Sequence, residues 1–288
     1  MKQRVISAIV GIAVAIVILT LNITKFPFLL NIALAAIACL SLHEILLATK
    51  FISNKAIVFA SFAVTVFIMF IPVFDETLWA RLFAIAGVAY FLLMFCILLF
   101  SNNKANVERI GLAFMATAIV AMPFYSLIYM YWQSPYDTDK FRYVGQAMVI
   151  YVFAASWFTD MGAYFFGRLF GKHKLAPKIS PKKTVEGLIG GIVFSIGMVS
   201  LAGYLLTGPL HVSDLEVNWV NLIVITALSC GLSVIGDLSF SIIKRCFDVK
   251  DFGNIMPGHG GILDRFDSVI FVSPVVCILN MYLPIIVK

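Results

Sequence analysis

Long, continuous apolar runs separated by short polar segments fill this chain from one end to the other. A helix that spans a membrane needs about 20 mainly apolar residues, and the runs show no period-two alternation of the kind found in membrane barrels. We therefore predict an all-α polytopic membrane protein with about nine transmembrane helices. The predicted spans cover residues 5–22, 26–47, 57–73, 78–100, 110–132, 143–166, 186–207, 219–243 and 268–287.

Composition supports a membrane protein. Of the 288 residues, 61% are hydrophobic and 12% are charged, whereas soluble domains carry about 25% charged residues. The first span follows Lys2 and Arg4, as in a signal peptide. Its apolar run is longer than the core of a signal peptide, and no small-x-small cleavage site precedes Lys25. We expect an uncleaved first helix.

Basic residues alternate between the two faces of the predicted topology. One face carries the basic run 168–183 and most other lysines and arginines, while the other carries most of the isolated acidic residues. The positive-inside rule then places the N-terminus in the cytoplasm and the C-terminus outside. The net charge of +6 suits anionic headgroups or an anionic cytosolic substrate. Membrane proteins in general share this bias, so it indicates little about function.

The chain changes character from Asp160 onward. Residues 1–140 form five spans with short connections, where His43, Glu44 and Glu108 stand alone and are interpreted as helix-end or interfacial residues. Two long polar segments, 167–185 and 244–267, follow. We predict an N-terminal bundle over 1–140 and a catalytic half over 141–288.

The first polar segment contains a predicted helix start over residues 180–187. Lys182 and Lys183 come just before Thr184, and Glu186 falls in the first turn. Free backbone N–H groups and lysines at such a site bind phosphate well. A basic anchoring loop explains the same residues equally well.

Two further features flank this segment. Asp160 lies late in the sixth span, so it must face protein or water rather than lipid. Gly187, Gly191 and Ser195 recur every four residues and predict a small-residue stripe for helix packing.

The second polar segment has a high density of charged residues and glycines. Residues 241–267 hold four carboxylates, four basic residues and a Pro-Gly-His-Gly-Gly turn in 27 positions, and charge beside a bilayer usually marks function. If the eighth helix continues, Asp237, Ser241, Lys244 and Asp248 share one face.

A divalent cation would explain the carboxylates. Asp237 and the i, i+3 pair of Asp264 and Asp267 can converge on Mg²⁺, which takes carboxylate oxygens together with water or phosphate. An Asp–Arg ion-pair network is the alternative. The turn at 257–261 can approach an anion with its backbone N–H groups, with His259 binding phosphate. A Cys246–His259 nucleophile and base is a weaker alternative.

These residues resemble the phosphatidate cytidylyltransferase (CDP-diacylglycerol synthase) family. Its signature, Ser-x-x-Lys-Arg-x4-Lys-Asp followed by His-Gly-Gly-x-x-Asp-Arg-x-Asp, is matched throughout. The resemblance covers about residues 156–268, while the first five spans match in hydropathy only. The matched positions are Ser241, Lys244, Arg245, Lys250, Asp251, Gly253, His259, Gly260, Gly261, Asp264, Arg265 and Asp267.

The resemblance implies transfer of a cytidylyl group from CTP to phosphatidic acid, giving CDP-diacylglycerol and pyrophosphate in phospholipid biosynthesis. It also implies a bacterial inner-membrane enzyme with its site facing the cytoplasm, Mg²⁺ held by Asp237 and Asp264, and a second, monovalent cation such as K⁺. Lys244 and Arg245 would complete the catalytic set. The implied substrate-binding residues are Asp160, Ser180, Lys182, Lys183, Thr184, Glu186, Ser241, Lys250, Asp251, His259, Gly260, Gly261, Arg265 and Asp267.

Two other functions stay open. Another CTP-using lipid enzyme, such as a polyprenol kinase, needs similar contacts, and a transporter of anionic solutes could use Asp160 and Asp237 along its path. The expected partners are CTP, phosphatidic acid and membrane lipids, with no nucleic acid. A homodimer is left open.

Overall fold

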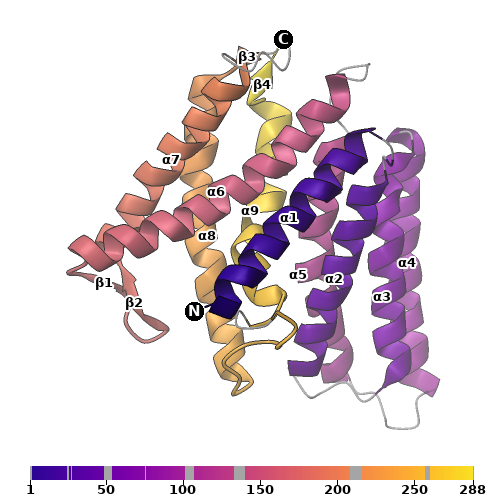
Figure 1. The fold of residues 1–288 in the computed structure, drawn as a ribbon. Coiled ribbons are helices and arrows are strands. Elements are labelled where there is room, and N and C mark those ends of the chain that lie inside the picture. Colours follow the sequence, from indigo (N-terminus) through magenta and orange to yellow (C-terminus); the bar gives the residue numbers. More distant parts are fainter. Residues whose placement is uncertain are drawn as a thin grey trace. The chain divides into compact units, whose positions relative to one another are not determined.

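The computed structural model describes residues 2–24, 26, 28–48, 54–74, 76–100, 107–132, 140–207, 216–256 and 260–287. Helices dominate these residues, with a few short strands (Figure 1). The α-helices are α1 (Lys2–Thr24), α2 (Leu29–Ala48), α3 (Lys55–Phe70), α4 (Glu76–Phe100), α5 (Val107–Trp132), α6 (Lys140–Phe170), α7 (Val185–Thr207), α8 (Trp219–Cys246) and α9 (Leu263–Tyr282). A 3₁₀ turn, η1 (Ile71–Val73), follows α3.

The prediction of a polytopic helical membrane protein is confirmed. Within the described residues, the 8 helices α2 to α9 are long and apolar enough to cross a membrane. The predicted first span also forms a helix, α1, which includes the apolar stretch Ala13–Asn22. Helix ends differ from the predicted ends by a few residues, most clearly at α9, which begins at Leu263 instead of residue 268.

Contacts between Cα atoms divide the chain into two compact units. The first comprises Met1–Gln133 and Lys244–Phe266, and the second comprises Ser134–Ile243 and Asp267–Lys288. The segment Lys244–Phe266 therefore groups with the N-terminal helices. The predicted division at residue 140 into a bundle and a catalytic half concerns function and stays a prediction.

Buried polar groups link the helices of the first unit, where α2 to α5 lie side by side (Figure 1). The Tyr90 hydroxyl of α4 lies 2.9 Å from both Ser61 Oγ of α3 and Thr117 Oγ1 of α5. Asn31 Nδ2 of α2 donates to the Met69 carbonyl of α3 at 2.8 Å. Hydrogen bonds between helices matter in a membrane because apolar side chains gain little by leaving lipid for a protein neighbour.

Helices α6 and α7 of the second unit pack at backbone distance through glycines. A Cβ added at Gly187 would lie 2.7 Å from the Ala163 carbonyl oxygen, and one added at Gly191 would lie 2.9 Å from that of Thr159. Ser195 Oγ, one turn further, donates to a carbonyl of α6 at 3.1 Å. The predicted small-residue packing stripe is confirmed.

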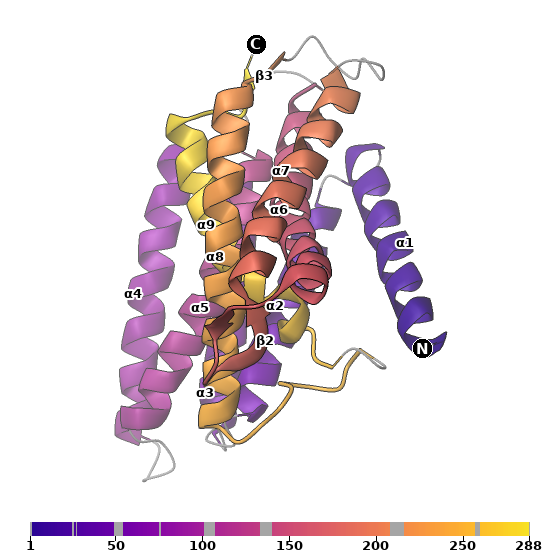
Figure 2. The same cartoon turned by 90° about the vertical axis from the view of Figure 1, so that its left-hand side faces the viewer.

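A small hairpin connects these two helices (Figure 2). Strands β1 (Lys174–Ala176) and β2 (Ser180–Thr184) pair antiparallel. The predicted helix start within 180–187 is confirmed, since α7 begins at Val185 with Glu186 in its first turn, and the residues before it, Ser180–Thr184, form strand β2. Thr184 Oγ1 accepts from Gly187 N at 3.1 Å as the N-cap of α7. A second short pair joins β3 (Glu216–Val217) and β4 (Ile286–Val287).

Candidate functional site

The signature segment begins where α8 ends. Lys244 and Arg245 lie in its last turn, where cations are favoured by the helix dipole. Asp248 adopts a left-handed conformation with φ of 54°, and Val249 N donates to the Lys244 carbonyl at 2.9 Å. This is a C-terminal capping turn. Helix α8 thus runs past its predicted end at residue 243 and stops at Cys246, so it includes Ser241 and Lys244 but not Asp248.

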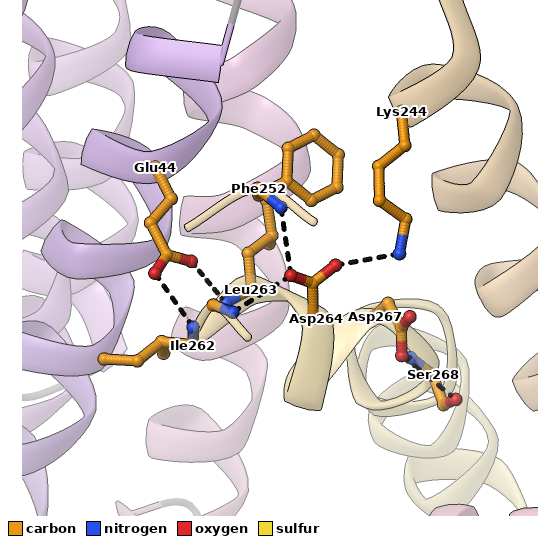
Figure 3. Close-up of polar contacts among 9 residues, drawn as sticks. Glu44, Lys244, Phe252, Ile262, Leu263, Asp264, Asp267 and Ser268 are labelled. Carbon is orange, nitrogen blue, oxygen red and sulfur yellow. Dashed lines mark hydrogen bonds and ion pairs between the residues drawn. The ribbon is translucent and has the colours of Figure 1, made fainter. Parts of the chain in front are cut away.

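Asp264, in the first turn of α9, closes the segment back onto α8 (Figure 3). Its Oδ1 accepts from Lys244 Nζ at 2.8 Å. Its Oδ2 accepts from the backbone N–H groups of Phe252 at 3.0 Å and Gly261 at 3.1 Å. Only 3% of the Asp264 side chain and 14% of the Lys244 side chain are exposed. A single buried carboxylate thus joins a helix end and both ends of the loop.

The two arms of the loop between α8 and α9 are hydrogen-bonded to each other at Met256 and Gly260. Met256 N donates to the Gly260 carbonyl at 3.0 Å, and Gly260 has a φ of +85°, which favours glycine. A Cβ there would lie 3.4 Å from the carboxylates of both Asp251 and Asp264. Gly260 therefore lies between two acidic side chains. Residues 257–259, with the predicted phosphate-binding His259, lie outside the described residues.

Glu44 of α2 holds the start of α9 from a distant part of the sequence (Figure 3). Its side chain is buried, and its Oε1 and Oε2 accept from Ile262 N at 2.9 Å and Leu263 N at 2.8 Å. The interpretation of Glu44 as an isolated helix-end residue is wrong. The one available signal was a carboxylate inside an apolar span, the same signal that singled out Asp160.

In the second unit, the predicted site residues and their polar partners come from three helices, α6, α8 and α9, and from the hairpin. Asp160 of α6 accepts from Ser268 Oγ of α9 at 3.0 Å and from Ser233 Oγ of α8 at 3.4 Å. The expectation that Asp160 faces protein or water rather than lipid is confirmed by these protein partners. Asp237 of α8 forms an ion pair with Lys183 of β2. Asp267 is buried, and its Oδ1 accepts from Ser268 N at 2.8 Å.

Two predicted substrate-binding residues, Thr184 and Glu186, form hydrogen bonds where the hairpin meets the helices on either side. Thr184 caps α7, as described above. Glu186 accepts from Lys172 N at 3.0 Å and lies 2.6 Å from His173 Nδ1. These bonds fix the hairpin to the start of α7. Ser180 and Ser241 are half-buried, whereas the remaining predicted residues on the described chain are exposed: Lys182, Arg245, Lys250, Asp251 and Arg265.

Each carboxylate predicted to bind metal has a lysine partner in its own unit, Lys183 for Asp237 and Lys244 for Asp264. Across the part of the chain that the structure describes, no three His, Cys, Asp or Glu side chains gather as a metal-binding group. Mg²⁺ commonly takes one or two carboxylates and completes its shell with water and substrate phosphates. Each carboxylate, taken by itself, therefore fits Mg²⁺ as one of a few protein ligands that water and substrate phosphate would complete.

Similarity to known proteins extends over nearly the whole chain. Residues 2–283 match the cytidylyltransferase family. The phosphatidate cytidylyltransferase of Staphylococcus epidermidis is 37% identical over 287 residues, which cover 97% of this chain and 98% of the relative. That of Staphylococcus aureus is 35% identical over 284 residues, covering 97% and 98%. That of Bacillus subtilis is 33% identical over 282 residues, covering 95% of each chain.

Proposed function

Because this chain belongs to the cytidylyltransferase family, we propose that it transfers the cytidylyl group of CTP to phosphatidic acid, producing CDP-diacylglycerol and pyrophosphate. The observation that carries this proposal is the match to phosphatidate cytidylyltransferases over nearly the full length of both chains. The acidic and glycine-rich segment 241–267 falls inside the matched region.

The chemistry needs one displacement at phosphorus. A phosphate oxygen of phosphatidic acid attacks the α-phosphorus of CTP, and the bond from that phosphorus to the oxygen bridging to the β-phosphate breaks. Pyrophosphate leaves with the electron pair of that bond. The nucleophile is already ionised at neutral pH, so no general base is required. Catalysis then depends on orienting the two phosphates and compensating their charge.

Lysines already fixed beside carboxylates are suited to bind these phosphates. An ammonium group has three N–H donors, so Lys183 and Lys244 can each keep the carboxylate contact and still donate to a phosphate oxygen. The exposed Lys182, Arg245 and Lys250 would add positive charge around them. Asp251 and Asp267 would orient these groups.

Mg²⁺ is the cofactor that suits the proposed reaction, with Asp237 and Asp264 as its protein ligands and a monovalent cation such as K⁺ as a second ion. When bound, Mg²⁺ would polarise the α-phosphoryl group and neutralise the pyrophosphate. Buried polar contacts fix the carboxylate of Asp264 in advance.

The proposed substrates require the signature segment to lie on the cytoplasmic side of the membrane. The positive-inside distribution of lysines and arginines supports an N-terminus in the cytoplasm of a bacterial cell. The signature segment would then face the cytosol, where CTP is present, and the lipid would keep its acyl chains in the bilayer. A homodimer is compatible with this arrangement.

The deciding experiment uses detergent-purified protein with phosphatidic acid, Mg²⁺ and CTP labelled either on the α-phosphate or on the γ-phosphate. We expect α-label in the lipid phase and one pyrophosphate released per lipid product. Asp264→Asn should abolish both signals while the protein stays folded. Asp248→Asn is the matched control, because Asp248 is exposed in the same segment and asparagine tolerates its left-handed conformation.

The other outcomes separate the rival functions. Transfer of the γ-label to a lipid alcohol would identify a kinase. Solute uptake by proteoliposomes without consumption of CTP would identify a transporter. Either result would replace the proposal.

A further inference from the structure

We propose that Glu44 is a positioning residue of the cytidylyl transfer reaction, acting from α2 through the signature loop to set the place of Asp264. The sequence pattern indicated no functional role for Glu44. The inference rests on the proposed function in one respect, that Asp264 belongs to the active site. The contacts of Glu44 themselves are independent of that assignment.

Glu44 and Asp264 divide consecutive backbone amides between them. Gly261 N donates to Asp264, while Ile262 N and Leu263 N donate to Glu44. The loop therefore turns so that three successive N–H groups point at two carboxylates. A shift of Glu44 would rotate the same peptide units that hold Asp264.

At the other end of the loop, neighbouring residues likewise contact Asp264 and Glu44. Phe252 N donates to Asp264, and the next residue, Gly253, lies against the Glu44 carboxylate so closely that an added Cβ would overlap it. At Gly261 an added Cβ would lie 2.5 Å from Glu44 Oε2. Two glycines of the loop are thus needed where Glu44 approaches.

The start of α9 has no cap of its own. The residues before Leu263 are Gly261 and Ile262, neither of which offers a side-chain oxygen as serine, threonine, aspartate or asparagine would. Glu44 supplies two acceptor oxygens to the buried N–H groups of Ile262 and Leu263, which would otherwise lack a partner at the start of the helix. A glutamine could offer only one oxygen, and its NH₂ group would face a backbone donor.

The test combines hydrogen–deuterium exchange with kinetics on the full-length protein. Glu44→Gln should speed amide exchange in residues 260–266 and leave exchange in α5 unchanged. We expect kcat to fall roughly 10- to 100-fold, as when residues that orient metal ligands are changed, with a much smaller change in KM for CTP. Glu44→Asp, which keeps two acceptor oxygens, should recover part of kcat. Glu108→Gln, an exposed glutamate of α5, should alter neither measurement.

A second comparison isolates the contact with the loop. Gly253→Ala should lower kcat in the wild-type background, because its Cβ displaces the Glu44 carboxylate. In a Glu44→Ala background, the same substitution should have little further effect. Additive losses would show that the two residues act separately and would overturn the proposal.

Two other results would also overturn it. Unchanged exchange at 260–266 in Glu44→Gln would show that the carboxylate does not hold the loop. Faster exchange in both α2 and α5 would show a general loss of folding instead of local positioning. If the wild-type protein lacked transferase activity, the exchange data would still decide whether Glu44 holds the loop, whereas the proposed function would fail alone.

Discussion

Replacing Lys244 with methionine tests whether Asp264 depends on its lysine partner for stability. Methionine has nearly the length of lysine, so Lys244→Met removes the charge and leaves the apolar stem largely in place. Asp264 would keep its two backbone donors and lose its counter-ion. Because 97% of its side chain is shielded from solvent, water can replace that counter-ion only in part.

The size of the effect follows from the geometry. Two unit charges 2.8 Å apart attract by about 6 kcal/mol at an effective dielectric constant of about 20. Desolvation of both groups offsets part of this attraction, and removing one partner of a buried pair typically costs about 3–5 kcal/mol. The two remaining N–H donors favour the lower end. A loss of about 3 kcal/mol corresponds to a fall of roughly 6–12 °C in the unfolding midpoint.

Thermal unfolding in one detergent at one scan rate measures this loss, since apparent midpoints of membrane proteins depend on scan rate. Lys250→Met is the control, because Lys250 is exposed in the same segment and should change stability by less than about 0.5 kcal/mol. The double variant Lys244→Met/Asp264→Asn should regain at least half of the lost stability and remain inactive. A wild-type midpoint for Lys244→Met, or strictly additive losses in the double variant, would refute the reasoning.

Two predictions concern the second unit. Gly190→Val should destabilise the protein severely, because its Cβ would overlap the side chain of Phe166. Gly197→Val on the same helix meets open space and should be tolerated. The midpoints of thermal unfolding of the two variants would distinguish them, and equal midpoints would contradict the packing argument. Thr184→Val removes the N-cap of α7 and should cost about 1 kcal/mol, measured in the same way, while Thr184→Ser should retain most of the stability.

Hydropathy was enough to locate the helices because each span must satisfy its backbone internally and cover itself with apolar side chains. Those two requirements depend only on neighbouring residues. The stripe of Gly187 and Gly191 could be recognised for the same reason, since its period is that of one helix. Asp160 and Asp237 stood out as carboxylates within apolar runs.

The features that escaped prediction depend on distant partners or on short segments. Glu44 acquires its role from residues 262 and 263, and nothing near it in the sequence indicates them. The strand Ser180–Thr184 depends on pairing with Lys174–Ala176, and the helix-start pattern of residues 180–187 does not indicate that partner. At the end of α8, the capping turn at Asp248 stops a helix that polar periodicity alone would have continued.

The bonds from Glu44 to the start of α9 also set an order of events during synthesis. Glu44 precedes its partner Ile262 by 218 residues, so at about 5–20 residues per second the ribosome needs about 10–45 s to supply that partner. During this interval the Glu44 carboxylate of α2 lacks the backbone N–H groups that donate to it in the folded protein. The N-terminal helices can insert early, but the first unit becomes complete only when the chain has been made through Phe266.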